Sequence, residues 1–336
     1  MQLIDAAPLM HFPQPLSLRW FRRVLHFKRP ATTSRGALQT RTTYIIEANG
    51  CGLGECCSMP GLLPEPTEAE LDFWCKKAER QQGLPAEAPS PICFGLECAM
   101  LSALQQGKPR WDTPFSRGEE GIPIHHLVWM DDIDTMLASI HHGLQSGFNC
   151  VKLKVGALDF DKELDLLQEA HRSFPEVELR VDANGAFSPQ EALIRLDALA
   201  AAGVSSIEQP IRCRQWQQLA ELCRNAPLAI ALDEELIGTS PQQLLETVQP
   251  QALVIKPSLH GGLLAAQNWA SYAETNNISW WVNSALESNI GLTALAEWCA
   301  YATPGKMQAL GKGNLFTDDS SHRVSLIGNQ LKMQEI

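Results

Sequence analysis

Ionisable residues recur at one phase of five successive strand–helix units, and a sixth lies two residues before the first of them. Each falls within or at the end of a short apolar run that is typical of a buried strand, and the runs follow one another at roughly the spacing of one strand–helix unit. These residues are Lys152, Lys154, Asp182, Glu208, Asp233 and Lys256. An ionised side chain in a packed interior costs several kcal/mol unless it is paired or bound to a metal. We therefore expect the six side chains to meet at one site.

The chemistry of such a site follows from its donor atoms. Three carboxylates that converge from neighbouring strands repel one another, and a divalent cation would relieve that repulsion. Ligands that are all oxygen, without His or Cys, favour a hard ion, and Mg²⁺ keeps positions free for water or substrate oxygens. The alternative is a salt-bridge network of the three acids and three lysines, without chemistry. A network does not need one residue per strand at the same end, so the pattern favours the metal site.

The elements that would position these residues alternate regularly after residue 122. Short β-rich runs are separated by amphipathic helical runs such as 159–174 and 188–203. Eight strands with helical crossovers predict an α/β fold of the (β/α)₈ barrel type, in which the carboxyl ends of the strands meet at one mouth where active sites lie. The strands are expected at 122–130, 150–155, 177–183, 204–210, 228–235, 252–258, 278–285 and 306–311.

The first part of the chain has a different character. Two possible strands are expected at 16–27 and 42–48, followed by a turn region rich in Gly and Pro at 49–66. Two helices are expected at 67–82 and 93–106. A capping box of Thr67 and Glu70 opens the first of these helices. Strands followed by helices, without alternation, indicate a separate α+β unit. We expect an α+β capping domain over 1–115, the barrel over 116–318, and a tail over 319–336 that returns to the cap.

The composition bounds the class of protein. The chain has 336 residues, of which 45% are hydrophobic and 19% are charged, so a large core can form and general disorder is excluded. A net charge of −11 argues against a nucleic-acid or anionic membrane partner. The first residues lack the pattern of a signal peptide, and no apolar run is long enough for a membrane span. Ten cysteines without zinc-site spacing are expected to be reduced thiols, which indicates a cytoplasmic protein.

The motifs around the six charged residues resemble those of the enolase superfamily, within its muconate lactonizing enzyme-like subgroup. In this order and spacing they are specific to the superfamily, and the resemblance covers essentially the whole chain. The superfamily joins a (β/α)₈-type, TIM-like barrel to an N-terminal α+β capping domain. The motifs are VKLKVG at 151–156, RVDANGAF at 180–187, IEQP at 207–210, LDEEL at 232–236, VIKPS at 254–258 and NSALESNIGL at 283–292.

The resemblance implies a role for each charged residue. The metal ligands would be Asp182, Glu208 and Asp233, and the metal would be Mg²⁺, with Mn²⁺ able to replace it. Lys154 would be the general base, and Lys152 would tune it. Lys256 would lie on the opposite face of the substrate.

Within the subgroup, the chain most resembles enzymes that dehydrate 2-succinyl-6-hydroxy-2,4-cyclohexadiene-1-carboxylate to o-succinylbenzoate, which feeds menaquinone synthesis. The base removes a proton next to a carboxylate, and hydroxide then leaves from the same face. Such a proton is very weakly acidic because its removal gives a dianionic enediolate, whose charge Mg²⁺ would stabilise. A lysine acts as a base only when neutral, and a neighbouring cation at Lys152 disfavours the charged form.

Three further positions are expected to contact the substrate: Asn184, Ser284 and Glu287. Each has an alternative interpretation. Asn184 is also typical of a turn, and Ser284 of a helix N-cap. Glu287 resembles an acid of the family motif after the seventh strand, although an acid in the first turn of a helix is stabilising in itself.

Other residues near the motifs have less specific patterns. Arg180 is expected either to brace the site or to form an ion pair in the core. Glu234 or Glu235 could replace Asp233 as a ligand. The cap segment 58–62 is expected to close over the substrate or to form an ordinary turn. The histidines have no metal-site spacing and are expected to be core or solvated residues.

Rival functions use the same scaffold. An N-succinylamino acid racemase or a dipeptide epimerase needs one lysine on each face, and this chain has both; a cycloisomerase is a further possibility. Epimerases of the family carry an Asp-x-Asp element near the eighth strand, and GKGNLFTDD at 311–319 lacks it in the usual place. A barrel that binds a metal and a carboxylate without turnover is the rival from another class. The expected partner is a small carboxylate, and the pattern assigns no oligomeric state.

Overall fold

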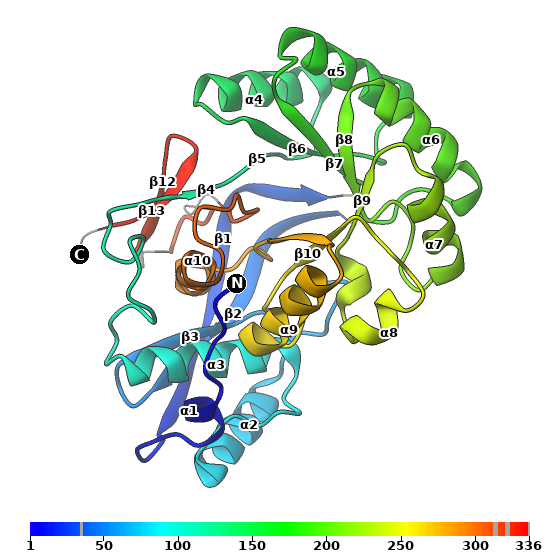
Figure 1. Ribbon diagram of the computed structural model, residues 1–336. Helices are drawn as coiled ribbons and strands as arrows, with labels where there is room; N and C mark the ends of the chain where they lie inside the picture. The colour runs from blue at the N-terminus through cyan, green and yellow to red at the C-terminus, as the bar shows by residue number, and fades with distance from the viewer. Residues whose placement is uncertain (34–35, 312–314, 320–322, 335–336) are drawn as a thin grey trace.

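The computed structural model describes residues 1–33, 36–311, 315–319 and 323–334 (Figure 1). Seven parallel strands follow one another in sequence order around a curved sheet, which confirms the α/β barrel prediction. The strands are short, and their carboxyl ends carry the charged motif residues. They are β5 His126–Val128, β6 Cys150–Lys154, β7 Glu178–Asp182, β8 Val204–Glu208, β9 Ala229–Leu232, β10 Ala252–Ile255 and β11 Ser279–Val282.

The eighth expected strand, 306–311, differs from the prediction. It joins its neighbours only through isolated parallel bridges, from Gln308 to Ile124 and from Ala309 to Asn283. The Gln308 side chain takes the place of a ladder partner, because its Oε1 accepts from Val282 N at 2.7 Å. The first expected strand, 122–130, is likewise divided into β4 Ile122–Pro123 and β5. The barrel is therefore closed by single bridges at this seam rather than by a continuous strand.

Helices cover the outside of the sheet (Figure 1). The two helical runs predicted at 159–174 and 188–203 are confirmed as α5 and α6. Asp159 caps α5 by accepting from Asp161 N at 3.2 Å and Lys162 N at 3.3 Å. The helical elements are α4 Ile133–Gln145, α5 Phe160–Ser173, α6 Pro189–Ala201, α7 Trp216–Asn225, the 3₁₀ turn η1 Glu234–Leu236, α8 Pro241–Leu245, α9 Gly262–Thr275 and α10 Asn289–Ala302.

The cap consists of one antiparallel sheet and three helices. Its strands are β1 Leu18–Thr33, β2 Gly36–Ala48 and β3 Gly52–Cys56, in the order β1-β2-β3. Its helices are α1 Ala7–Met10, α2 Glu68–Gln81 and α3 Ser90–Leu104. The predicted capping box is confirmed, since Glu70 Oε2 accepts from Thr67 N at 2.8 Å and Thr67 Oγ1 accepts from Glu70 N at 3.2 Å.

Strand β3 lies where only turns were predicted, and that prediction was wrong. Glycines such as Gly54 suggested turns, but here they allow the strand to lie directly on α3. A Cβ atom at Gly54 would lie 2.0 Å from the carbonyl oxygen of Gly95, and one at Gly52 would lie 2.2 Å from that of Ala99. Such distances exclude any side chain. The glycines therefore mark close packing against a helix, which the local sequence does not reveal.

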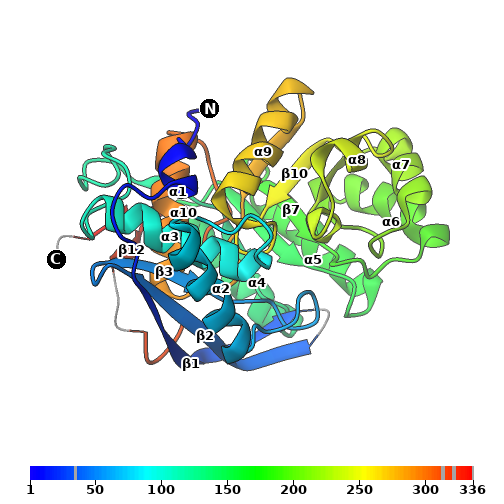
Figure 2. The same cartoon turned by 90° about the horizontal axis from the view of Figure 1, so that it is seen from below.

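The β1–β2 hairpin is longer than expected and extends from the cap towards the barrel (Figure 2). Residues 315–319 run beside it: Lys28 N donates to Leu315 O at 2.9 Å, and Thr317 N donates to His26 O at 2.9 Å. The tail then forms a hairpin of β12 Val324–Ile327 and β13 Gln330–Met333, and β13 pairs with β4. Residues 315–319 thus contact the cap, and the tail residue Arg323 donates to Gly107 O of the cap at 3.3 Å, whereas the tail hairpin pairs with the start of the barrel.

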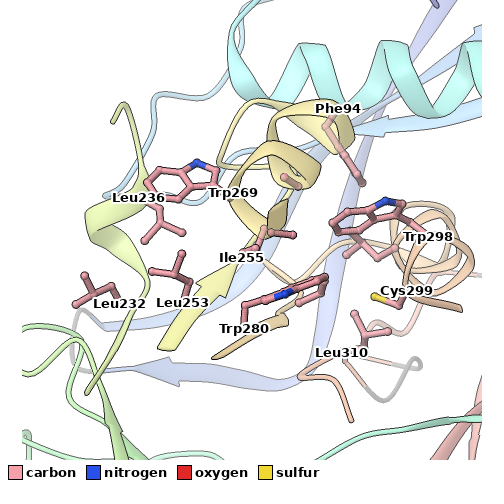
Figure 3. Packing of buried hydrophobic residues seen from close by; sticks show 14 of the residues in the cluster. Phe94, Leu232, Leu236, Leu253, Ile255, Trp269, Trp280, Trp298, Cys299 and Leu310 are labelled. Atoms are coloured by element: carbon pink, nitrogen blue, oxygen red, sulfur yellow. The ribbon is translucent and has the colours of Figure 1, made fainter. Parts of the chain in front are cut away.

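One apolar core continues from the cap into the barrel. Phe94 of α3 lies beside Trp298 of α10, and the chain of packed side chains runs on through Trp280 and Ile255 (Figure 3). All ten cysteines are free thiols; eight are buried as small hydrophobes, as expected, whereas Cys51 is exposed and Cys213 is half-buried. Among the described residues, no helix has the length and apolar character to cross a membrane.

Candidate active site

A cavity of about 440 Å³ lies at the carboxyl ends of the barrel strands, beneath the cap. The barrel contributes Lys152, Lys154 and Lys256 to its wall. The cap contributes the tip of the β1–β2 hairpin, at 36–38, and the loop at 59–62. The remaining wall is largely apolar. The predicted loop therefore borders the cavity, whereas the contribution of the hairpin tip was not predicted.

Lys152 joins two of the three acids. It comes from the middle of β6 and its side chain is buried. Its Nζ lies 2.7 Å from Glu208 Oε2 and 3.3 Å from Asp182 Oδ2. The parallel register places Lys152 opposite Arg180, and Asp182 opposite Glu208. Adjacent strands therefore bring these groups together, as the sequence predicted.

Lys154 lies two residues further along β6, on the same face. Its Nζ donates to Asp182 Oδ2 at 2.5 Å and to Asn184 Oδ1 at 2.9 Å. The backbone N of Asn184 donates to the other Asp182 oxygen at 3.0 Å. Asp182 is completely buried, whereas Lys154 reaches the cavity. The lysine thus stands between the acid and the space in which a substrate would lie.

Lys256 follows β10 on the other side of the cavity, and its Nζ forms an ion pair with Asp233 Oδ2. The structure thus brings together all six predicted residues. It shows them as an ion-pair network of three lysines and three acids, which is the arrangement that the sequence gave as the alternative to a metal site. In a metal site the same acids would face the ion, in place of the Lys152 Nζ that lies between Asp182 and Glu208.

Electrostatics differ between the three acids. Burial favours the neutral form of each acid and the neighbouring lysines oppose it. Lys154 and Lys152 hold the pKa of Asp182 well below its usual value, and Lys256 lowers that of Asp233. For Glu208, burial and the Asp182 carboxylate outweigh Lys152 and raise the pKa to about 8.

The acids in turn raise the pKa of two of the lysines, Lys152 and Lys256. Burial alone would lower the pKa of Lys152, but the carboxylates of Glu208 and Asp182 outweigh it and raise the pKa. Burial is likewise outweighed at Lys256, where Asp233 and Glu208 raise the pKa above its usual value.

Two buried carboxylate oxygens form no hydrogen bond within this network. Within the described residues, Glu208 Oε1 and Asp233 Oδ1 have no hydrogen-bond partner. A buried carboxylate oxygen without a partner is costly, so a ligand for these atoms is expected. The donor set is all oxygen and suits Mg²⁺. No group of three His, Cys, Asp or Glu side chains in the described ranges is already gathered around one point, because lysine Nζ atoms lie between the acids.

The three expected substrate contacts have different positions. Asn184 and Ser284 line the cavity. Ser284 is not a helix N-cap, since Ser288 caps α10. Glu287 is not among the lining residues: its carboxylate accepts from Ser258 Oγ at 2.5 Å and from Ala285 N at 2.7 Å. Glu287 therefore joins the loops that follow β10 and β11.

Arg180 and Glu235 have structural partners. Arg180 pairs with Glu178 at 2.8 Å, and its guanidinium lies 4.6 Å from the centre of the Trp281 ring. Glu235 accepts from Arg214 N at 2.9 Å and from Trp216 Nε1 at 2.5 Å. Arg180 thus forms an ion pair, as in one of its two expected roles, but the pair lies at the edge of the core, with the Glu178 side chain 38% exposed. Both Glu235 oxygens are occupied by these donors, so the geometry does not support Glu235 as a ligand.

Glu55 of β3 connects the cap to the barrel. It is completely buried, and its carboxylate accepts from Thr43 Oγ1 at 2.7 Å, Ser288 Oγ at 2.6 Å, Ser288 N at 3.0 Å and Gly291 N at 2.9 Å. A cap residue therefore satisfies backbone N–H groups at the start of α10, in the barrel. The sequence gave no sign of this contact, because its partners lie more than 230 residues apart.

We expect the Glu55→Ala substitution to lower the free energy of unfolding by about 2–4 kcal/mol, because it leaves several buried donors without an acceptor. Urea unfolding of both proteins would measure the difference. The exposed Glu176 provides the matched control, and Glu176→Ala should change stability by less than about 0.5 kcal/mol. Equal stability of the Glu55 variant and the wild type would contradict the proposed connection.

Comparisons with known proteins agree with this geometry. The sequence model of the family described as enolase C-terminal domain-like matches residues 135–327. An o-succinylbenzoate synthase of Desulfotalea psychrophila is 40% identical, over 94% of this chain and 98% of that protein. An o-succinylbenzoate synthase of Listeria innocua is 26% identical, over 86% of this chain and 83% of that protein.

Solved structures show the same architecture. The crystal structure of MenC from Desulfotalea psychrophila superposes with a TM-score of 0.82 at 34% identity, over 95% of this chain and 100% of that one. The L-Ala-D/L-Glu epimerase of Bacillus subtilis, in a substrate-liganded complex, gives a TM-score of 0.79 at 20% identity, over 95% and 96% of the two chains. The second likeness concerns the fold alone.

Proposed function

Because this chain belongs to the o-succinylbenzoate synthase family within the enolase superfamily, we propose that it dehydrates 2-succinyl-6-hydroxy-2,4-cyclohexadiene-1-carboxylate to o-succinylbenzoate, a step of menaquinone synthesis. The observation that carries the proposal is the cavity itself. Two lysines from opposite sides of the barrel, Lys154 and Lys256, border it, and buried acids stand behind them. The apolar remainder of the wall suits a six-membered carbon ring.

Lys154 performs both proton transfers in the proposed reaction. Its neutral amine takes the proton from the carbon next to the ring carboxylate, and the electron pair of the broken C–H bond passes into an enediolate. The C–O bond to the hydroxyl group on the same face then breaks. Lys154 returns its proton to the departing hydroxide, which leaves as water, and the ring becomes aromatic. The position of Lys154 at the cavity wall supports this role.

Lys256 and Lys152 act through their charges. Lys256 stays protonated and stabilises the enediolate from the opposite face, consistent with the raised pKa that its acid neighbours give it. Lys152 lies against Asp182 and Glu208, beside Lys154 in the same strand. We propose that this cation tunes Lys154 for the first proton transfer.

Asp182, Glu208 and Asp233 would hold Mg²⁺, with Mn²⁺ as a substitute. The free oxygens of Glu208 and Asp233 support this assignment, and so does the all-oxygen donor set. When bound, the metal stabilises the negative charge that develops on the substrate carboxylate. Asn184 and Ser284 are proposed to contact the substrate from the cavity wall. We propose that Glu287 acts indirectly, by holding the loop that carries Ser284.

A racemase or epimerase is the second candidate, because both lysines border the cavity. The contacts of the two acids near the expected Asp-x-Asp position favour dehydration over racemisation or epimerisation. Asp318 pairs with His26 at 2.9 Å, and Asp319 accepts from Asn289 N at 2.6 Å, so both are held by the cap and by α10. Neither lines the cavity. Residues 312–314 of the same motif lie outside the described part of the chain.

The test is an assay of the purified protein with Mg²⁺ on two substrates in parallel. With the cyclohexadiene carboxylate, we expect the ultraviolet absorbance of the diene to fall as o-succinylbenzoate forms in equal amount. With N-succinyl amino acids, optical rotation should change more slowly or not at all. Faster racemisation than dehydration would favour the second candidate. Tight carboxylate binding without turnover of either substrate would indicate a non-catalytic barrel.

The same proposal places the protein in the cytoplasm, acting on a small carboxylate rather than on nucleic acid or a membrane. The ten free cysteines support a reducing compartment.

A further inference from the structure

Asn184 lies between the proposed base and a carboxylate to which the mechanism assigns no role. Its Oδ1 accepts from Lys154 Nζ at 2.9 Å, and its Nδ2 donates to Glu234 Oε1 at 2.9 Å. Its backbone has φ of 46°, a left-handed conformation that Asn adopts more readily than most residues. Glu234 is 4% exposed and begins the η1 turn directly after Asp233. Two hydrogen bonds therefore connect Glu234 to Lys154 through the Asn184 side chain.

The Glu234 carboxylate determines which way the Asn184 amide faces. An amide has a donor end and an acceptor end, and a carboxylate can only accept. If the amide turned over, its oxygen would face Glu234 and its NH₂ group would face the N–H groups of Lys154. Both contacts would then be repulsive. Glu234 therefore selects the orientation in which an oxygen faces Lys154.

This orientation matters because of how a neutral lysine is built. The neutral amine has two N–H groups and one lone pair. Asp182 Oδ2, at 2.5 Å, and Asn184 Oδ1, at 2.9 Å, can accept the two N–H groups. The lone pair then points in the remaining direction, and Lys154 borders the cavity. Two fixed acceptors thus aim the lone pair of an otherwise flexible side chain at the substrate.

We propose that Glu234 is a positioning residue that acts through Asn184 to aim the Lys154 amine at the C–H bond to be broken. The inference rests on the proposed function, since it assumes that Lys154 is the base. A small misplacement of a catalytic group, of about 1 Å, costs as much as 100-fold in rate. Glu234 is thereby distinguished from Glu235, the next residue in the same turn, whose carboxylate is held by Arg214 and Trp216.

The variants separate positioning from other roles. Glu234→Ala removes the acceptor, whereas Glu234→Gln keeps an oxygen that can accept from Asn184. Asn184→Gly removes the amide and tolerates the left-handed backbone. Glu235→Gln is the matched control, because it changes a buried carboxylate in the same turn that does not reach Asn184. All are assayed as full-length protein with Mg²⁺, with stability measured by thermal unfolding and Mg²⁺ binding by calorimetry.

We expect Glu234→Ala to lower kcat by about 10- to 100-fold with KM changed less than about threefold, and Asn184→Gly to lower kcat by a similar factor. Glu234→Gln should restore kcat to within about threefold of the wild type. The double variant Glu234→Ala/Asn184→Gly should be no slower than Asn184→Gly alone, because Glu234 acts only through that amide. The kinetic isotope effect from deuterium at the abstracted position should rise in both single variants, and Glu235→Gln should leave all these values unchanged.

Several results would overturn the inference. One is an unchanged kcat in Glu234→Ala. Another is a double variant whose kcat falls by the product of the two single-variant losses. Weakened Mg²⁺ binding that Glu234→Gln does not restore would instead make Glu234 a metal ligand. If Glu234→Ala does not fold, Asn184→Gly decides, and a kcat equal to that of the wild type overturns the inference. A wild-type protein that does not dehydrate the substrate refutes the proposed function and this inference together, whereas an active wild type with an insensitive Glu234 refutes the inference alone.

Discussion

The Lys154→Ala variant is expected to lose dehydration activity by about 10²- to 10⁴-fold in kcat, the usual contribution of a general acid or base. Lys154 is proposed to take the proton and to return it to the departing hydroxide, so its loss impairs both steps. No other side chain described at the cavity wall combines a basic nitrogen with its position between Asp182 and Asn184. Diene absorbance measured at saturating substrate gives kcat directly.

The control for this variant is Lys162→Ala, which removes an exposed lysine of α5 and should leave kcat unchanged. Thermal unfolding and calorimetric Mg²⁺ binding should show that Lys154→Ala still folds and binds the metal. A Lys154→Ala variant that folds and keeps a kcat within threefold of the wild type would contradict the assignment of the base.

Removal of Mg²⁺ is expected to have an effect of similar size. Stabilisation of charge by a metal contributes several kcal/mol, so chelation should lower the rate by at least about 10³-fold, and added Mg²⁺ should restore it. Binding should also be visible without turnover. At a free Mg²⁺ concentration of 100 times Kd, the free energy of unfolding should rise by about 2.7 kcal/mol.

The stability measurement has its own control. Asp182→Asn should abolish the increase caused by Mg²⁺, because it removes a proposed ligand charge. Asp197→Asn, at an exposed position of α6, should preserve the increase. Full activity in the presence of excess chelator, or an equal increase in both variants, would contradict the proposed metal site.

The barrel and its charged residues could be predicted because both are periodic. A strand that is buried on both faces is recognisable from its apolar run, and a charge within it stands out. The parallel register then places residues of equal phase side by side, as with Lys154 beside Asp182 and Asp182 beside Glu208. Local pattern alone was therefore sufficient to gather the acids and lysines.

The cap could be predicted less well because its contacts are long-range. Gly52 and Gly54 suggested turns, yet they permit a strand to lie against α3. The hairpin tip at 36–38 has no chemical signature, and only the fold brings it to the cavity. The expected eighth strand illustrates the same point, since a single side chain, Gln308, takes over a hydrogen bond that a strand would make.

Within the site, the sequence indicated residue types better than their orientation. Glu287 was expected to contact the substrate, but its carboxylate bonds to Ser258 and Ala285 behind the cavity wall. Glu234 was considered only as a substitute ligand, whereas the structure joins it to Asn184. Spacing along the chain places a side chain on a strand or loop, but its hydrogen-bond partners come from other strands.

The most direct test of the account is a crystal structure of the protein with Mg²⁺ and o-succinylbenzoate. We predict one ion with oxygens of Asp182, Glu208 and Asp233 at about 2.1 Å, and with Lys154 and Lys256 on opposite faces of the bound ring. A metal elsewhere, or both lysines on the same face of the ring, would contradict it.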